Sequence, residues 1–189
     1  MAKTESINGS DLMLFIDGTS IALATNHTLQ VTMATKDTST KDNGLGMWSN
    51  FEAGLMSWNV SSENLMSVAS SNGKSINEVF DLYLQRKPVK VVFGLQSNNQ
   101  DFTQKLETEW DVPDGGWKPD TANHYEGDAL ITDFSINAPN GEKATASISL
   151  TGCSNLKKIG NGIQKATVAG KGEAVAPVPS NVETAALKK

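Results

Sequence analysis

The chain of 189 residues is poor in the residues that catalytic and metal sites need, with one cysteine, Cys153, and two histidines, His27 and His124. A single cysteine excludes a disulfide scaffold and a cysteine-based zinc site, and it favours a reducing compartment. We expect both histidines to be surface or capping residues and Cys153 to be a buried, inert thiol. No apolar run approaches the roughly 18 residues of a membrane span, so the sequence predicts a soluble protein.

Other active-site and binding patterns are also missing. A formal net charge of -5 argues against general nucleic-acid binding, which needs clustered Lys and Arg. The Gly44–Gly46 segment has no following Lys and Ser/Thr for a phosphate loop, and Asp37–Asp42 has no EF-hand spacing. The acids Glu107 and Glu109, with tryptophans nearby, leave a glycosidase as the remaining enzyme alternative, although turn structure is the favoured interpretation. We therefore predict no enzyme activity, no metal and no cofactor.

Most of the chain has the period-2 alternation of apolar and polar residues that is typical of β-strands. The sequence predicts a mainly β fold, an antiparallel β-sandwich or partial barrel, with one packed α-helix over Ser75–Lys87. That helix has Ser75 and Glu78 in capping-box spacing, an apolar face at helical spacing and Pro88 as its stop. We expect one domain over residues 1–160 and a flexible or extended tail over 161–189.

The stretch from Thr28 to Met66 contains two strand-like segments separated by an unusually long loop, Thr35–Trp48. Hairpin loops are mostly two to five residues, and longer ones are usually functional or disordered. The loop is polar but ends in large apolar residues, which indicates an arm that contacts another molecule. Trp58 alternates with apolar neighbours and is expected in the core, whereas Trp48 either folds back onto the domain or anchors a partner.

A family resemblance rests on the order and character of segments between residues 10 and 155. These segments are Ile21–Gly44, Trp48, Ser57–Leu65, the helix Ile76–Arg86, and the strands Pro88–Phe93, Tyr125–Thr132 and Leu150–Gly152. In this order they resemble the major tail (tail tube) proteins of long-tailed bacteriophages. Residues 96–123 and the tail from 161 lie outside the resemblance.

The resemblance implies a structural virion protein located in the tail and assembled in the host cytoplasm. Such subunits form hexameric rings that stack into a hollow tube, the conduit for DNA ejection. The implied partners are other copies of the chain, together with tape-measure, tail-terminator and tail-tip proteins. DNA passes through the tube transiently, and neither a membrane nor a small-molecule substrate is expected.

Three sets of residues follow as candidate assembly sites. The arm is expected to reach the next ring through Lys36, Asp37, Thr38, Ser39, Thr40, Lys41, Asp42, Met47 and Trp48. The polar faces of the strands flanking the arm and of the Gly127–Ile136/Ala144–Thr151 hairpin are candidates for the lumen: Thr28, Gln30, Thr32, Thr145, Ser147 and Ser149. The third set is an acidic block in residues 101–133, where nine acids stand against two lysines. It includes Glu107, Glu109 and Asp111, and is expected near the lumen or a subunit seam.

Two other kinds of protein remain open from the sequence. One is the inner tube of a contractile injection or type VI secretion apparatus. The other is a non-enzymatic β-sandwich module that binds a carbohydrate or a protein. Rings or tubes of the purified protein would separate the tube proteins from the binding module.

Overall fold

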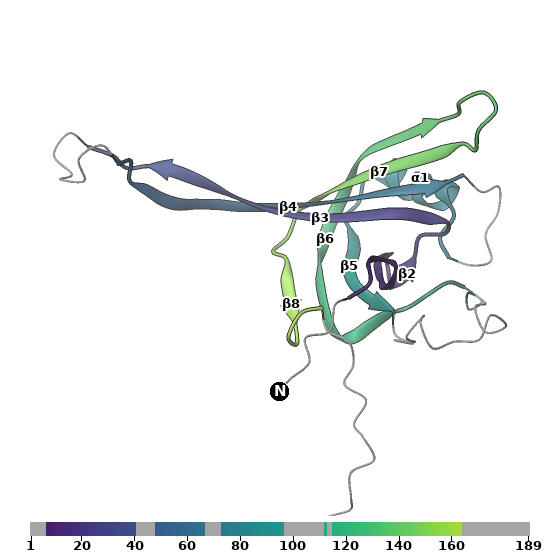
Figure 1. The fold of residues 1–189 in the computed structure, drawn as a ribbon, viewed down its shortest axis with the longest axis horizontal. Coiled ribbons are helices and arrows are strands. Elements are labelled where there is room, and N and C mark those ends of the chain that lie inside the picture. The colour runs from purple at the N-terminus through teal and green to yellow at the C-terminus, as the bar shows by residue number, and fades with distance from the viewer. Residues whose placement is uncertain (1–6, 41–47, 67–72, 97–111, 113–114, 164–189) are drawn as a thin grey trace, which may run out of the picture.

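The computed structural model describes residues 7–40, 48–66, 73–96, 112 and 115–163. A short 3-10 helix, Gly9–Asp11, leads into a chain of strands with one α-helix among them (Figure 1). The strands are β1 (Leu12–Ile16), β2 (Thr19–Ser20), β3 (Ala24–Asp37), β4 (Phe51–Leu65), β5 (Val89–Gln96), β6 (Pro119–Asn137), β7 (Thr145–Gly152) and β8 (Lys157–Ile159), and the helix is α1 (Ile76–Gln85). The prediction of a mainly β, antiparallel fold with one helix is confirmed.

The strands form one antiparallel sheet in the order β2-β1-β5-β6-β7-β4-β3, with β8 added to β6. The long strand β6 joins the two halves, since it pairs with β5 through its first part and with β7 through its second. Side chains of β1 and β5 share one buried cluster with those of β4 and β7, for example Leu14 and Val91 with Val60 and Ile148. The two halves of the sheet therefore pack face to face around a common core.

The helix α1 begins where the sequence predicts and ends two residues earlier. The Ser75 side chain accepts a hydrogen bond from the Glu78 backbone N–H, and Glu78 accepts one from the Ser75 backbone N–H, so the capping box is confirmed. The helix ends at Gln85 because Arg86 takes a left-handed conformation, φ 54°. Ile76 and Val79 are buried in the core and Tyr83 is partly buried against it, but Phe80 and Leu84 of the same apolar face are exposed.

Trp58 links β4 to the loop after β7, as its predicted core position requires. Its side chain is 5% exposed, and its indole Nε1 donates a hydrogen bond of 2.7 Å to the Ser154 carbonyl. The ring lies so close to Gly152 and Gly127 that a Cβ at either position would overlap it. These two glycines are thus required for a close approach rather than for a turn.

Three local predictions are wrong. His27 is not a surface or capping residue, because it is half-buried inside β3, where a register shift between Ala24 and Asn26 bends the ladder. His124 is not one either, since it is buried on β6. Cys153 is an exposed thiol directly after β7, because it follows the last ladder position and lies outside the core.

Candidate functional site: the sheet edges, the polar face and the arm

The strands β3, β4, β7 and β6 present one continuous polar face. Residues directly opposite in an antiparallel ladder point to the same side of the sheet. Thr28 of β3 pairs with Ser61 of β4, which pairs with Ser149 of β7, which pairs with Asp133 of β6. One neighbouring row has the same character, namely Asn26, Glu63, Ser147 and Ser135. The other consists of Gln30, Asn59 and Thr151 and ends at β6 in the apolar Leu130.

The structure thus brings the predicted lumen-facing residues of β3 and β7 onto one surface, with β4 between them. Thr28 and Gln30 lie on it with Ser147 and Ser149, and Thr32 and Thr145 lie at its two ends. Sequence reasoning missed the contribution of β4, namely Asn59, Ser61 and Glu63, although their alternation with buried Trp58 and Val60 is visible in the sequence.

The polar face consists mostly of hydroxyl and amide groups. Its three rows contain two carboxylates, Glu63 and Asp133, and no lysine or arginine. Hydroxyls on adjacent strands pair with each other: Thr32 Oγ1 lies 2.8 Å from Ser57 Oγ, and Thr132 Oγ1 lies 3.1 Å from Thr151 Oγ1. Such a surface is hydrated and carries a small negative charge, so it offers phosphate groups no cation.

This four-stranded part of the sheet has two free edges in the described chain. β3 ends the strand order, so the side of β3 away from β4 has no partner strand there. On the other side, β5 pairs with β6 only as far as Ala129, which leaves Leu130–Asn137 with β7 alone. Unpaired backbone N–H and C=O groups along an edge are a template for another strand.

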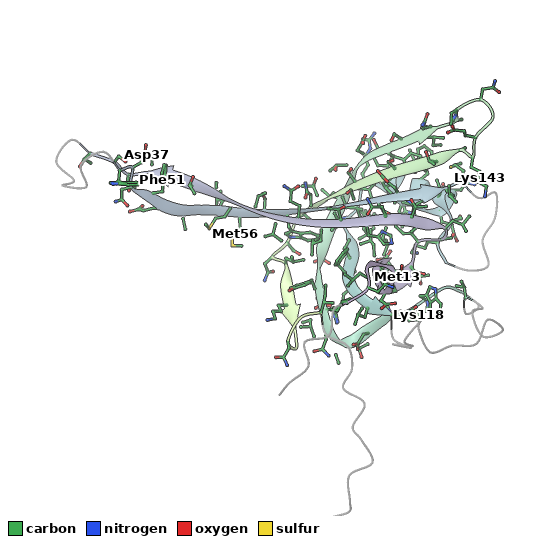
Figure 2. All side chains as sticks on the ribbon, viewed as in Figure 1. Met13, Asp37, Phe51, Met56, Lys118 and Lys143 are labelled. Atoms are coloured by element: carbon green, nitrogen blue, oxygen red, sulfur yellow. The ribbon has the colours of Figure 1, made fainter. Side chains whose placement is uncertain are left out.

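The arm is a two-stranded β-ribbon that extends well beyond the body of the protein (Figure 1). β3 and β4 stay paired as far as Asp37 and Phe51, whereas β7 pairs with β4 only from Asn59 inward. The predicted loop is therefore shorter than Thr35–Trp48, because its first three residues belong to β3. Figure 2 shows Asp37 and Phe51 near the outer end of the ribbon and Met56 part-way along it.

The outer part of the arm exposes many large apolar side chains. Leu55 is 87% exposed and Trp48 is 82% exposed, and Met56 and Phe51 are more than half exposed. Trp48 therefore does not pack on the described part of its own domain. At the base of the ribbon, Val31 and Met33 of β3 are about half exposed. An isolated ribbon of two strands has little to bury, so apolar residues at this density indicate a contact with another molecule.

Hydrogen bonds close the described end of the arm. The Thr38 backbone N–H donates to the Asn50 carbonyl at 2.9 Å, and the Asn50 N–H donates to Ser39 Oγ at 2.8 Å. Asp37 Oδ1 accepts a bond from the Ser39 N–H. Hydrogen bonds from the Ser39 side chain, and then from its backbone, lower the pKa of Asp37 below its ordinary value. Lys36 and Thr40 are exposed beside them, whereas Lys41, Asp42 and Met47 lie outside the described residues.

The histidines offer little for catalysis. His27 is half-buried on the core side of β3, and this burial lowers its pKa to about 4, so it stays neutral at physiological pH. It lines an open groove of about 780 Å³ together with Leu23, Met13, Phe93 and Trp117, and its Nδ1 has no hydrogen-bond partner. His124 Nε2 lies 3.6 Å from Glu126, which is itself paired with Lys90 at 2.8 Å.

Neither a metal cluster nor a membrane helix is found in the part of the chain that the structure describes. No three His, Cys, Asp or Glu side chains there lie close enough together to hold a metal ion. No helix there is long and apolar enough to cross a membrane. Within the predicted acidic block, Glu107, Glu109 and Asp111 lie outside the described residues, and Asp133 lies on the polar face.

Several solved structures share this arrangement of strands. A chain of the virion of a native gene transfer agent particle matches with a TM-score of 0.59 and 13% identity, covering 81% of this chain and 98% of that chain. The SPP1 tail tube matches with a TM-score of 0.56 and 14% identity over 85% of this chain and 82% of that one. A chain of the baseplate of the anti-feeding prophage, a six-fold symmetrised structure, matches with a TM-score of 0.50 and 12% identity over 84% and 98%.

The chain has the tail-tube fold. No family model and no curated protein sequence matches it. The sequence identities are only 12–14%, so it is the structural similarity that establishes the common fold.

Proposed function

We propose that this chain is the non-enzymatic structural subunit of a hollow tail tube. Six copies form a ring, rings stack into a tube, and DNA passes through it during ejection. The observation that carries the proposal is the four-stranded sheet with a polar face, a free edge on each side and an arm extending from one end. The assembled tube is part of the virion tail, where tape-measure, terminator and tip proteins are its further partners.

The two free edges can close a ring because they belong to the same sheet and differ in direction. β6, β7, β4 and β3 alternate in direction, so the β3 of a neighbouring copy continues the alternation next to β6. Edge β3 then joins edge Leu130–Asn137 of the next copy, a heterologous contact that closes when the rotation matches. Closure removes the exposed edges from the structure.

The expected dimensions suit a DNA conduit. We take six copies because the neighbour from the anti-feeding prophage has six-fold symmetry. Six copies of a four-stranded sheet form a barrel of about 24 strands. With strands about 4.8 Å apart and tilted by about 40°, the wall has a diameter of about 48 Å between backbones. After side chains are added, the lumen is still wide enough for a DNA duplex.

The polar face lines this lumen. Its hydroxyl and amide groups hold water, and its two carboxylates per copy repel phosphate groups rather than bind them. A conduit should not hold its cargo, because every cation on the wall would add affinity for the phosphate backbone. The opposite face of the same strands is apolar and packs into the core, so the polar face points away from the core of its own subunit.

The arm connects consecutive rings. It extends past the last strand that supports it and presents exposed apolar side chains such as Met56 and Leu55. A head-to-tail contact along the ring axis does not close, so it generates a filament. The subunit therefore uses edge pairing within a ring and the arm between rings.

The test is negative-stain electron microscopy of the purified protein over a concentration series. The proposal predicts annular rings and hollow tubes whose length increases with concentration. A monodisperse monomer at all concentrations, or solid fibres with no central channel, would contradict it. A monomer that binds a glycan would instead favour the β-sandwich binding module.

A second candidate is the inner tube of a contractile injection apparatus. The similarity to a chain of the anti-feeding prophage baseplate favours it, although with a lower TM-score than the similarity to the gene transfer agent virion. The two candidates share the ring, the lumen and the arm. They differ in whether a contractile sheath binds the outer surface, which co-purification from particles would establish.

A further inference from the structure

The apolar face of α1 is only partly used by its own subunit. Phe80 is 39% exposed and Leu84 is 59% exposed, although both lie on the amphipathic face that the sequence predicts to be buried. Ile76 and Val79, one turn away, are buried completely or almost so. The helix thus has apolar surface beyond the part that its own core covers.

This uncovered surface lies at the free edge of β6. The Phe80 ring packs against Phe134 of β6 with ring centroids 5.0 Å apart. Ile136, two residues further along β6 on the same core side, is 54% exposed. A groove of about 270 Å³ separates α1 from the edge and is lined by Tyr83, Leu84, Arg86, Leu130, Ile131 and Thr132. We name Phe80, Leu84, Phe134 and Ile136 the helix patch.

The opposite free edge has a matching exposed row. Leu29, Val31 and Met33 of β3 share the core side of the sheet with Val60, Trp58 and Met56, their ladder partners. Leu29 is half-buried, whereas Val31 and Met33 are about half exposed because the core ends there. We name Leu29, Val31 and Met33 the β3 row.

We propose that the helix patch of each subunit covers the β3 row of its neighbour in the ring. The inference rests on the proposed function, and it adds a second, apolar layer to the edge pairing. When β3 of one copy adds to the β6 edge of another, side chains on the core side of both strands become adjacent, about 5 Å apart. The helix patch occupies that same side, next to the edge.

The partner is therefore a second copy of this chain rather than another protein. The two surfaces lie at opposite edges of the four-stranded part of the sheet, β6-β7-β4-β3, face the same side and are both apolar, so no single subunit can bring them together. Ring closure covers the helix patch and the β3 row of every copy. The contact also explains why a helix with a strong cap and a clear apolar face leaves part of that face unburied.

Leu84→Glu tests the contact, with Gln85→Glu as the matched control. Gln85 is exposed on the same turn, so its substitution adds the same charge outside the helix patch. We expect Leu84→Glu to leave the subunit folded and to raise the protein concentration needed for assembly by about tenfold or more, since a buried leucine becomes a buried charge. Gln85→Glu should assemble like the parent. Equal assembly of the two variants would overturn the inference.

A labelling experiment separates this inference from the proposed function. Leu84→Cys in a Cys153→Ser background should react with a bulky maleimide as a subunit and be protected in tubes. In the same background, Leu84→Cys combined in turn with Leu29→Cys, Val31→Cys or Met33→Cys should give a disulfide ladder between subunits in at least one pair. Tubes in which Leu84→Cys reacts freely and no pair cross-links overturn the helix contact only. Absence of tubes in the parent overturns the proposed function and the contact with it.

Discussion

The inner and outer halves of the β3–β4 hairpin have the same ladder but opposite surroundings. The inner half, around Gln30 and Val60, pairs with β7 and buries one face in the core. The outer half, from Val31 to Asp37 and from Phe51 to Ser57, has no third strand and no buried residue. The same alternation that builds a core in one half leaves exposed apolar residues in the other.

The difference indicates that the inner half contributes to the folding of the subunit and the outer half to its assembly. A two-stranded ribbon is marginally stable by itself, because most of the stability of a sheet comes from its packed face. The inner half is stabilised by its own subunit, whereas the outer half has no packed face there and gains one only in the proposed assembly. Mutations should therefore divide by position into those that affect folding and those that affect assembly.

Deletion of Asp37–Gly46 is expected to have the largest effect on assembly. The body keeps its core, so the thermal midpoint of the subunit should change little, while tubes should be absent by electron microscopy. If the shortened protein makes tubes of normal length, the arm is not the contact between rings.

Trp58→Ala is expected to have the largest effect on folding. Removal of this buried indole and its bond to Ser154 should lower the free energy of unfolding by about 3–5 kcal/mol. Met33→Ala, on the outer half of the same hairpin, should change it by less than about 0.5 kcal/mol. Urea titrations of the two variants measure the contrast, and similar losses for both would remove the distinction between the halves.

His27→Gln should reduce the loss of stability at acidic pH. Burial lowers the His27 pKa from 6.5 to about 4, so between these values the unfolded chain binds a proton that the folded chain does not. The free energy of unfolding therefore falls as the pH drops from 6.5 to 4, by on the order of 3 kcal/mol from this residue. Carboxylates contribute equally to parent and variant, so the difference between their pH profiles isolates His27. Parallel profiles would contradict the buried, neutral state.

Cysteine labelling tests which side of the inner half faces the lumen. In a Cys153→Ser background, Gln30→Cys and Ser147→Cys should react with a bulky thiol reagent in subunits and be shielded in tubes. Lys158→Cys on β8, outside the four-stranded sheet, is the control and should react in both states. Equal labelling of all three in tubes would place the polar face on the outside.

The smallest expected effect concerns the acidic block. The triple variant Glu107→Gln, Glu109→Gln, Asp111→Asn should assemble with a weaker dependence on salt than the parent, because like charges repeated around a ring repel each other within about 8 Å at physiological salt. Light scattering across a salt series measures this salt dependence of assembly. Superimposable curves for the two proteins would indicate a plain solvated surface.

The sequence predicts local features well where one residue pattern decides them. The capping box at Ser75 and Glu78 and the core position of Trp58 both follow from spacing, and the structure confirms them. The polar positions of β3 and β7 follow from alternation too. The placement of these polar positions on one face does not follow from alternation, because it depends on the pairing of β4 with β7 across about 90 residues of chain.

The errors come from contacts that are distant in sequence. His124 is predicted at the surface or at a cap, but β5 and β8 pair with its part of β6 on both sides and make it a central strand. His27 is predicted likewise, whereas the ladder to Ser62 and Glu63 of β4 continues past it and keeps it inside β3. Phe80 and Leu84 belong to the apolar face that the helical pattern predicts to be packed, but they are exposed, because the pattern does not say how much of that face the core covers.

A cryo-electron microscopy map of the assembled protein tests the central claim most directly. The account predicts a six-fold hollow tube whose wall is a continuous barrel, with β3 of one copy beside Leu130–Asn137 of the next and the side chains of Thr28, Ser61 and Ser149 facing the channel. A tube with these side chains on its outer surface, or with the edges of β3 and β6 left unpaired, would contradict it.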